Sequence, residues 1–416
     1  ALAGRDCRLA IGSRLASALL FFPPRALLAM TAPFLVRALT QSLAHVGGNV
    51  GRLTAISTLG SVAGTLLIGY VLLPLLPNSV TMLITAGVLA ALAAVYFLGW
   101  NRSARTATQL GLLTLLGLAL AAAALHVHRR SDLGHSVELH RRNSNFGLLQ
   151  VAARPDDDRR YLLNDYLVQN TYVPKEQRGA SAFSYVLHDL AAAHPPRVDS
   201  VLCIGLGIGL VPREFVGAGT RVDVVEINPE VVEIARDYFD CPTDKMRVVI
   251  GDGRQFLNVT TNRYDALVLD AFVGDSSPVH LFSREAFQAM RQVLNPGGVL
   301  AMNCFADFRP RRDFYGASIQ KTLASVFRSV QVHTAGTGNV YFLASDTEPL
   351  VPLRTPNFNR IHPEVRWIVE ASFSRQQHFD LRHGIVLTDD FNPAEFHDAA
   401  NREDIRLNLV RQMESL

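Results

Sequence analysis

The stretch Cys203-Ile204-Gly205-Leu206-Gly207-Ile208-Gly209 decides the fold. Its three alternate glycines come directly after an apolar segment with the pattern of a strand and directly before a segment with the pattern of a helix. Glycine lets the backbone approach a ligand closely, and the N-terminus of a helix favours negatively charged or polar groups. The loop is therefore a candidate ligand-binding turn, although a glycine-rich turn by itself indicates a nucleotide only weakly.

Strand-like and helix-like segments alternate on the C-terminal side of Val198. Such alternation predicts an α/β domain with a doubly wound, Rossmann-like parallel sheet. The predicted strands are Val201–Gly205, Arg221–Ile227, Arg247–Gly251, Ala266–Asp270 and Val299–Cys304.

Acidic residues stand at the ends of three of these strands. Glu226 closes the second strand, 21 residues after Gly205, where an acid can bind both ribose hydroxyls of a nucleoside. Asp252 follows the third strand between two glycines, and Asp270 ends the fourth. The carboxyl ends of parallel strands meet at one edge of the sheet, where such sheets bind ligands. We therefore expect one crevice there rather than separate turn or capping roles.

The glycine pattern differs from that of nicotinamide-binding sites. Leu210 stands where the dinucleotide motif has its third glycine, and the Gly251-Asp252-Gly253 and Pro296-Gly297-Gly298 turns are also foreign to that motif. The pattern instead resembles the fold of S-adenosylmethionine-dependent methyltransferases.

Residues 1–130 have the composition of a membrane region. They contain ten Arg, one Asp, and neither Lys nor Glu, whereas the whole 416-residue chain has a net charge of +3. Three uncharged segments of about 20 residues are long enough to cross a bilayer: Leu53–Leu76, Val80–Trp100 and Thr108–His128. A fourth, Leu15–Leu39, is interrupted by Pro23-Pro24-Arg25 and predicts either a kinked or a partly re-entrant span.

The arginines suggest an orientation for this region. With about four spans both ends lie on the same side, and the positive-inside rule mildly favours the cytoplasm for them and for the C-terminal domain. We thus expect a multi-pass protein of the bacterial inner membrane, anchored in the lipid bilayer, with more chain before Ala1 because the sequence lacks an initiator Met. Acids, Lys and His are absent from the middle of the spans, which favours an anchor over a transporter.

Several classes of partner follow from composition. The small residues Gly60, Ala63, Gly64 and Gly69 suit close helix packing against other membrane subunits or a second copy of the chain. The net charge averages two unlike halves and gives no sign that the chain binds nucleic acid.

The cysteines are scattered along the sequence, without a C-x-x-C motif or a His at the spacing of metal ligands. We therefore expect reduced thiols and no bound metal.

The remaining chain divides into three parts. Residues 131–178 predict a small β module with strands at Val137–His140, Phe146–Ala152 and Arg160–Leu163. Residues 179–350 form the Rossmann-like domain, and residues 351–416 form a tail packed on it. In that tail, Asp389 and Asp390 are expected to cap a helix at Pro393–Ala400, with a place facing the site as the alternative.

The sequence closely resembles the spermidine synthases, in particular their membrane-fused bacterial relatives. The resemblance is specific over Tyr161–Phe305 and extends more loosely from about Pro24 to Ser345. The segments with counterparts in that family are Gly51–Gly64, Asp165 with Gln169, Phe183-Ser184-Tyr185, Arg213-Glu214 and Leu281–Glu285.

The resemblance implies roles for individual residues. It implies that Gln169 contacts the ligand near its sulfonium, and that Tyr185 and Asp270 handle the amine that attacks. The residues that the resemblance implies for the nucleoside site are Gly205, Gly207, Gly209, Glu226, Asp252, Gly253 and Asp270. The chemistry agrees, because an alkylammonium must lose a proton before it attacks the methylene beside a sulfonium.

Two positions depart from the family pattern. Ile208 stands where active synthases have an acid in the glycine loop, and Val273 stands where they have a second acid after the fourth strand. A dicationic polyamine needs several carboxylates, because an unpaired ammonium is costly to remove from water. Asp275 and His280 are the candidates to compensate, although both also read as ordinary loop residues.

Three functions therefore remain open. The first is a transferase that uses decarboxylated S-adenosylmethionine to alkylate a small amine, which the resemblance favours. The second is a methyltransferase that uses S-adenosylmethionine, with an acceptor pocket made apolar by Ile208, Phe272 and Val273. The third is a non-catalytic accessory subunit of a membrane complex that keeps the fold.

Overall fold

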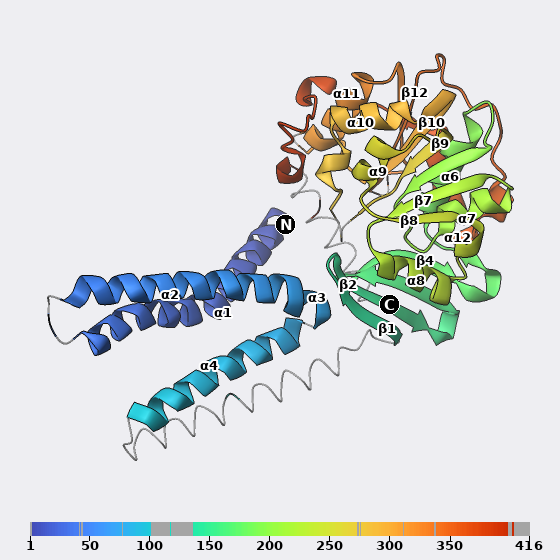
Figure 1. Ribbon diagram of the computed structural model, residues 1–416. Helices are drawn as coiled ribbons and strands as arrows, with labels where there is room; N and C mark the ends of the chain where they lie inside the picture. The colour runs from blue at the N-terminus through green and yellow to red at the C-terminus, as the bar shows by residue number, and fades with distance from the viewer. Residues whose placement is uncertain are drawn as a thin grey trace. The chain divides into compact units, whose positions relative to one another are not determined.

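The computed structural model describes residues 2–40, 42, 45–76, 78–100, 117, 136–272, 274, 276–310, 312–336, 338–397 and 402. Figure 1 shows its helices and strands. The chain divides into two compact units, Ala1–Thr81 and Met82–Leu416, and each is described by itself.

Long apolar helices make up the N-terminal part of the chain. They are α1 (Leu2–Leu39), α2 (Val46–Leu67), a π-helical turn (Ile68–Leu72), α3 (Leu73–Leu75) and α4 (Asn78–Trp100). Two stretches, Ser17–Leu39 and Val46–Leu75, are long and apolar enough to cross a membrane, and Val80–Tyr96 is a shorter apolar helix. The helix α1 continues through the prolines. The predicted span Thr108–His128 lies outside the described residues except for Gly117.

The β module is a five-stranded antiparallel sheet with its strands in chain order. The strands are β1 (Val137–Ser144), β2 (Gly147–Arg154), β3 (Arg159–Asn164), β4 (Leu167–Val173) and β5 (Arg178–Gly179). The three predicted strands are confirmed, with β1 longer than predicted. The strand β4 was not predicted because its turn lacks the usual Asn-Gly signal: Asp165 and Tyr166, both at positive φ, connect β3 to β4.

The α/β domain contains a mixed sheet of eight strands. Their order is β13-β11-β12-β10-β9-β6-β7-β8. The five parallel members agree with the predicted strands and are β6 (Ser200–Ile204), β7 (Arg221–Glu226), β8 (Arg247–Ile250), β9 (Tyr264–Leu269) and β10 (Leu294–Phe305). The prediction of a wholly parallel sheet was incomplete, because β12 (Asn339–Ser345) pairs antiparallel with β10, β11 (Ser329–His333) with β12, and β13 (Gln376–Gln377) with β11.

Helices cover both faces of this sheet (Figure 1). Successive side chains of a strand point to opposite faces. Val201 and Cys203 of β6 therefore pack with one apolar cluster, and Leu202 and Ile204 with the other. The helices of the first cluster are α6 (Ala182–Ala193), α7 (Leu210–Gly217), α8 (Pro229–Phe239) and α12 (Pro363–Ser374). Those of the second are α9 (Gly253–Val259), α10 (Arg284–Gln292) and α11 (Phe314–Ala324).

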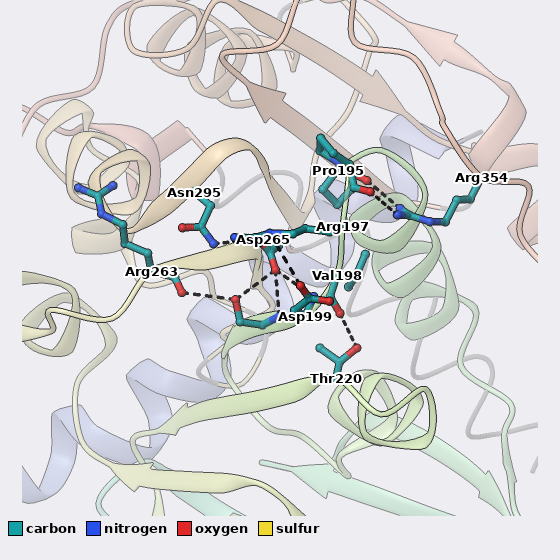
Figure 2. Close-up of polar contacts among 11 residues, drawn as sticks. Pro195, Arg197, Val198, Asp199, Thr220, Arg263, Asp265, Asn295 and Arg354 are labelled. Atoms are coloured by element: carbon teal, nitrogen blue, oxygen red, sulfur yellow. Dashed lines mark hydrogen bonds and ion pairs between the residues drawn. The ribbon is translucent and has the colours of Figure 1, made fainter.

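A buried carboxylate connects the starts of neighbouring strands through hydrogen bonds. Asp265, at the start of β9, is 3% exposed and accepts hydrogen bonds from the backbone N–H groups of Asp199 and Ser200 at 2.9 and 3.0 Å. It also accepts bonds from the side chains of Asn295 and Arg197, as Figure 2 shows. These contacts tie β6, β9 and β10 together at the edge opposite to their carboxyl ends.

Candidate functional site

A cavity of about 1580 Å³ lies at the carboxyl ends of the central strands, beside the β module. Among its lining residues are most of those predicted for the site: Gln169, Gly205, Gly207, Glu226, Asp252, Gly253 and Asp270. The structure thus brings the ends of β6, β7, β8 and β9 together as the alternation of strands and helices predicted.

The glycine loop packs against the neighbouring strand end. Gly205 has a φ of +95°, and a Cβ added there would lie 2.2 Å from the carbonyl oxygen of Asp270. A side chain at this position would therefore force the two loops apart. Gly209 caps α7 and faces Cys241 instead, and it is not among the described residues that line the cavity.

Glu226 holds the glycine loop in place. Its Oε2 accepts a hydrogen bond from the backbone N–H of Leu206 and its Oε1 accepts one from that of Asn228, both at 2.9 Å. Burial raises the pKa of Glu226, although these bonds oppose the shift. Each carboxylate oxygen keeps acceptor capacity, so Glu226 has the chemistry to bind a vicinal diol such as a ribose.

Asp252 connects a helix start to a loop histidine. Its Oδ1 caps α9 by accepting a bond from Gln255 N at 2.9 Å, and its Oδ2 lies 2.9 Å from Nε2 of His280. His280 also lines the cavity. The histidine that the sequence suggested as a proton acceptor is therefore paired with Asp252.

Asp270 is bonded to an amide that the sequence analysis did not single out. The Nδ2 of Asn303, on β10, donates to Oδ1 of Asp270 at 3.1 Å, and both residues line the cavity. Burial raises the pKa of Asp270 to about 6, while the bond from Asn303 lowers it. Asn303 is 3% exposed, and its Oδ1 has no hydrogen-bond partner among the described residues. A polar residue inside the apolar strand Val299–Cys304 was the signal that could have found it.

The structure does not bring Tyr185 to Asp270. Tyr185 lies on α6, is 2% exposed, and donates a hydrogen bond to the carbonyl oxygen of Gly179 at 3.1 Å. The guanidinium carbon of Arg360 lies over the Tyr185 ring, 5.5 Å from the ring centroid. Burial raises its pKa to about 12. Tyr185 is not among the described lining residues, whereas Phe183 is, because residues two apart on a helix point to different sides.

The positions that depart from the family pattern have different outcomes. Ile208 is 1% exposed in the core and is not among the described lining residues, so its expected place in an acceptor pocket was wrong. Phe272 does line the cavity. Val273 and Asp275 lie outside the described residues. Gln169 reaches the same loop from β4, because its Nε2 donates to the carbonyl oxygen of Gly274 at 3.0 Å.

The tail contacts α9 and the start of α10 rather than the cavity. Asp389 accepts bonds from Arg254, at 3.0 Å, and from the hydroxyl of Ser283. The expected capping by Asp389 or Asp390 was wrong, because Asn392 Oδ1 accepts the bond from Ala394 N at 3.2 Å. Neither aspartate is among the described residues that line the cavity.

Part of the chain is similar in sequence to known polyamine synthases. A family model described as "Spermine/spermidine synthase domain" matches residues 182–338. A probable polyamine aminopropyl transferase of Bifidobacterium longum is 28% identical over 263 residues, 57% of each chain. A polyamine aminopropyltransferase of Vibrio vulnificus is 37% identical over 131 residues, 30% of this chain and 44% of the relative. The chain thus spans about half the length of these curated relatives.

Other similar proteins include a methyltransferase and solved structures. Putrescine N-methyltransferase 3 of Nicotiana tabacum is 30% identical over 132 residues, 30% of this chain and 35% of the relative. The crystal structure of spermidine synthase from Thermotoga maritima has a TM-score of 0.45 and 20% identity, and covers 57% of this chain and 84% of that one.

Proposed function

We propose, from the match of residues 182–338 to a spermine/spermidine synthase domain, that the chain transfers the aminopropyl group of decarboxylated S-adenosylmethionine to a small amine. The observation that carries the proposal is the Asp270–Asn303 pair: both residues line the cavity, and the pair combines a carboxylate with a buried amide oxygen that has no partner among the described residues. Both are hydrogen-bond acceptors, which suits an amine nucleophile.

The residues around the cavity divide between the two reactants. Glu226 suits the ribose hydroxyls, and Asp252 and the backbone at Gly205 and Gly207 suit the nucleobase end. Gln169, whose Nε2 donates to the carbonyl oxygen of Gly274, suits the reacting end of the donor molecule. Because Gly205 and Gly207 have no side chains, the nucleoside can lie directly against the backbone of the glycine loop.

Asp270 accepts the proton in this proposal. A pKa of about 6 leaves its carboxylate mostly ionised at pH 7 and makes it a stronger base than an ordinary aspartate, which favours proton transfer from an ammonium. The amine nitrogen then forms a bond to the methylene carbon as the carbon–sulfur bond breaks. The sulfur leaves as the neutral thioether methylthioadenosine, and the proton passes from Asp270 to water.

The apolar N-terminal helices support a membrane anchor. Along Ser17–Leu39 and Val46–Leu75 the large apolar side chains are exposed, for example Leu19 at 75% and Leu59 at 71%. Water is a poor environment for such a surface, whereas lipid is a good one. We propose that these helices cross the bacterial inner membrane, with the α/β domain in the cytoplasm, where its nucleoside substrate is made.

A methyltransferase is the second candidate function. It is favoured by the similarity to a putrescine N-methyltransferase and by the apolar wall at Phe272, since S-adenosylmethionine would then donate a methyl group to the amine. The two functions give different products from the same site, methylthioadenosine or S-adenosylhomocysteine.

One experiment separates these candidates. The purified full-length chain is given each donor together with a panel of amines, and the nucleoside products are identified by mass spectrometry. We expect methylthioadenosine, formed only with the decarboxylated donor and lost in Asp270→Asn. Asp346→Asn, which removes a surface partner of Arg291, is the matched control. Turnover of neither donor would leave the accessory-subunit hypothesis.

A further inference from the structure

Two residue pairs follow one another along the wall of the cavity. Asn303 and Phe305 lie two residues apart on β10 and therefore on the same face, about 7 Å apart along the strand. Asn303 pairs with Asp270 through the 3.1 Å hydrogen bond. Phe305 pairs with Phe272, and their ring centroids lie 5.3 Å apart. All four residues line the cavity. A polar pair is thus followed by an aromatic pair.

The aromatic pair has no uncompensated carboxylate beside it among the described residues. Among the described residues, four acids line the cavity: Glu226, Asp252, Asp270 and Asp307. Of these, Asp270 belongs to the polar pair. Asp307, which follows Phe305, is bonded to Arg309 Nε at 2.7 Å, so the two charges cancel. Asp252 is paired with His280, and Glu226 accepts two backbone bonds in the glycine loop.

This arrangement discriminates between possible acceptors. An acceptor with a second ammonium would bring that charge to the aromatic pair, where it would lose hydration without gaining a carboxylate from the described residues. A cation–π contact with a phenylalanine face offsets part of this loss but supplies no counter-charge, whereas apolar contact with the rings carries no such loss. An aryl or alkyl group at the same distance from the nitrogen would instead bury apolar surface against both rings.

We propose that the acceptor is a primary amine with a single cationic nitrogen, whose aryl or alkyl group packs against Phe272 and Phe305. Its nitrogen lies at Asp270 and Asn303, and Phe272 and Phe305 determine specificity. The proposal rests on the proposed function, because it concerns the acceptor end of that same site. The covalent step is unchanged: a nitrogen–carbon bond forms, the carbon–sulfur bond breaks, and the nitrogen loses one proton.

Calorimetry with the full-length chain saturated with methylthioadenosine tests the proposal directly. The probes are 2-phenylethylamine, hexylamine and putrescine. We expect both monoamines to bind at least tenfold more tightly than putrescine. Phe305→Ala should weaken the binding of 2-phenylethylamine at least tenfold and leave methylthioadenosine binding unchanged, and Phe305→Leu serves if the alanine variant does not fold. Phe391→Ala, which removes a phenylalanine that is 62% exposed in the tail, is the matched control.

A converse variant sharpens the test. Phe305→Asp supplies a carboxylate at the aromatic pair and should reverse the preference in favour of putrescine. Equal or tighter binding of putrescine by the unaltered chain, or no effect of Phe305→Ala and Phe305→Leu, would overturn the inference while leaving the proposed function intact. Failure to bind methylthioadenosine at all would instead overturn the proposed function, and the inference with it.

Discussion

Asn303 Nδ2 donates a hydrogen bond to Asp270 Oδ1 over 3.1 Å, and so joins the interior of β10 to the carboxyl end of β9. The amide orients the carboxylate and at the same time opposes the effect of burial on its pKa. The same side chain leaves its own buried Oδ1 without a partner among the described residues. These two effects make Asn303 a positioning residue whose loss can be measured separately from that of Asp270.

Replacement of this amide should move the pH profile. Asn303→Leu removes the bond that lowers the pKa of Asp270, so that pKa should rise above about 6. The acidic limb of the kcat/KM profile should shift to higher pH by about one unit, while activity at pH 9 falls much less than at pH 6. Asp270→Asn should instead reduce kcat by about 10²–10⁴-fold above pH 7, where Asp270 is ionised, and should abolish the acidic limb. An unshifted limb in Asn303→Leu would show that another group titrates.

Glu226 should determine nucleoside binding. Glu226→Gln keeps the size of the side chain but replaces an acceptor by an amide donor, which cannot accept from a hydroxyl and a backbone N–H together. We expect methylthioadenosine to bind about 10–100-fold more weakly in calorimetry, equivalent to about 1.5–3 kcal/mol for bonds to a charged group. Glu233→Gln, an exposed residue of α8, should bind normally. Equal affinities in the two variants would remove Glu226 from the site.

Asp265 should matter for stability rather than for binding. Burial opposes its charge, but the bonds from Asn295, Asp199, Ser200 and Arg197 hold its pKa below the usual range. Asp265→Asn should lower the free energy of unfolding by about 2 kcal/mol and the Tm by about 4–8 °C. Asp199→Asn, whose side chain is 76% exposed, is the control.

The stabilisation by Asp265 also has a definite pH dependence. Since the pKa of Asp265 is depressed in the folded chain, its contribution is complete above the unfolded-state pKa of about 3.9 and disappears as the pH falls through the folded value. Thermal melting from pH 7 to pH 3 should therefore show the two chains converge only below about pH 4. A constant difference in Tm down to pH 3 would contradict this assignment.

The location of the α/β domain can be tested with reporters fused after Leu416. A fluorescent reporter that matures only in the cytoplasm should be active, and alkaline phosphatase, which needs the periplasm, should be inactive. The reverse pattern would contradict the orientation that the arginines favour. Recovery of the fusion from the soluble fraction would contradict the membrane anchor itself.

The central strands and most of the cavity were predictable because their signals are local. An apolar strand, a glycine turn and an acid at the next strand end specify both an element and its position at one edge of the sheet. Gly205, Glu226, Asp252 and Asp270 therefore line the cavity as the sequence indicated. The resemblance contributed Gln169, whose strand the periodicity had missed.

The residues whose places were predicted wrongly, or not at all, share a different physical cause. Tyr185 points away from the cavity because α6 packs against Arg360, which is distant in sequence. Ile208 lies in the core although Gly205 and Gly207 of the same loop line the cavity. The rotation of a helix and the direction of a loop side chain depend on tertiary packing, which a single sequence does not encode locally. Asn303 was missed for a related reason, since only the pairing of β10 with β9 brings it to Asp270.

Asp265 and Asp270 stand at opposite ends of one strand, and this separation has a practical consequence for protein engineering. The hydrogen bonds around Asp265 (Figure 2) bear on whether the sheet holds together. The cavity around Asp270 bears on what the sheet can bind. A designer can therefore strengthen the first edge, for example around Asn295 and Arg197, without touching the reacting end. Libraries that vary Phe272 and Phe305 for new acceptors would then start from a background with stability to spare.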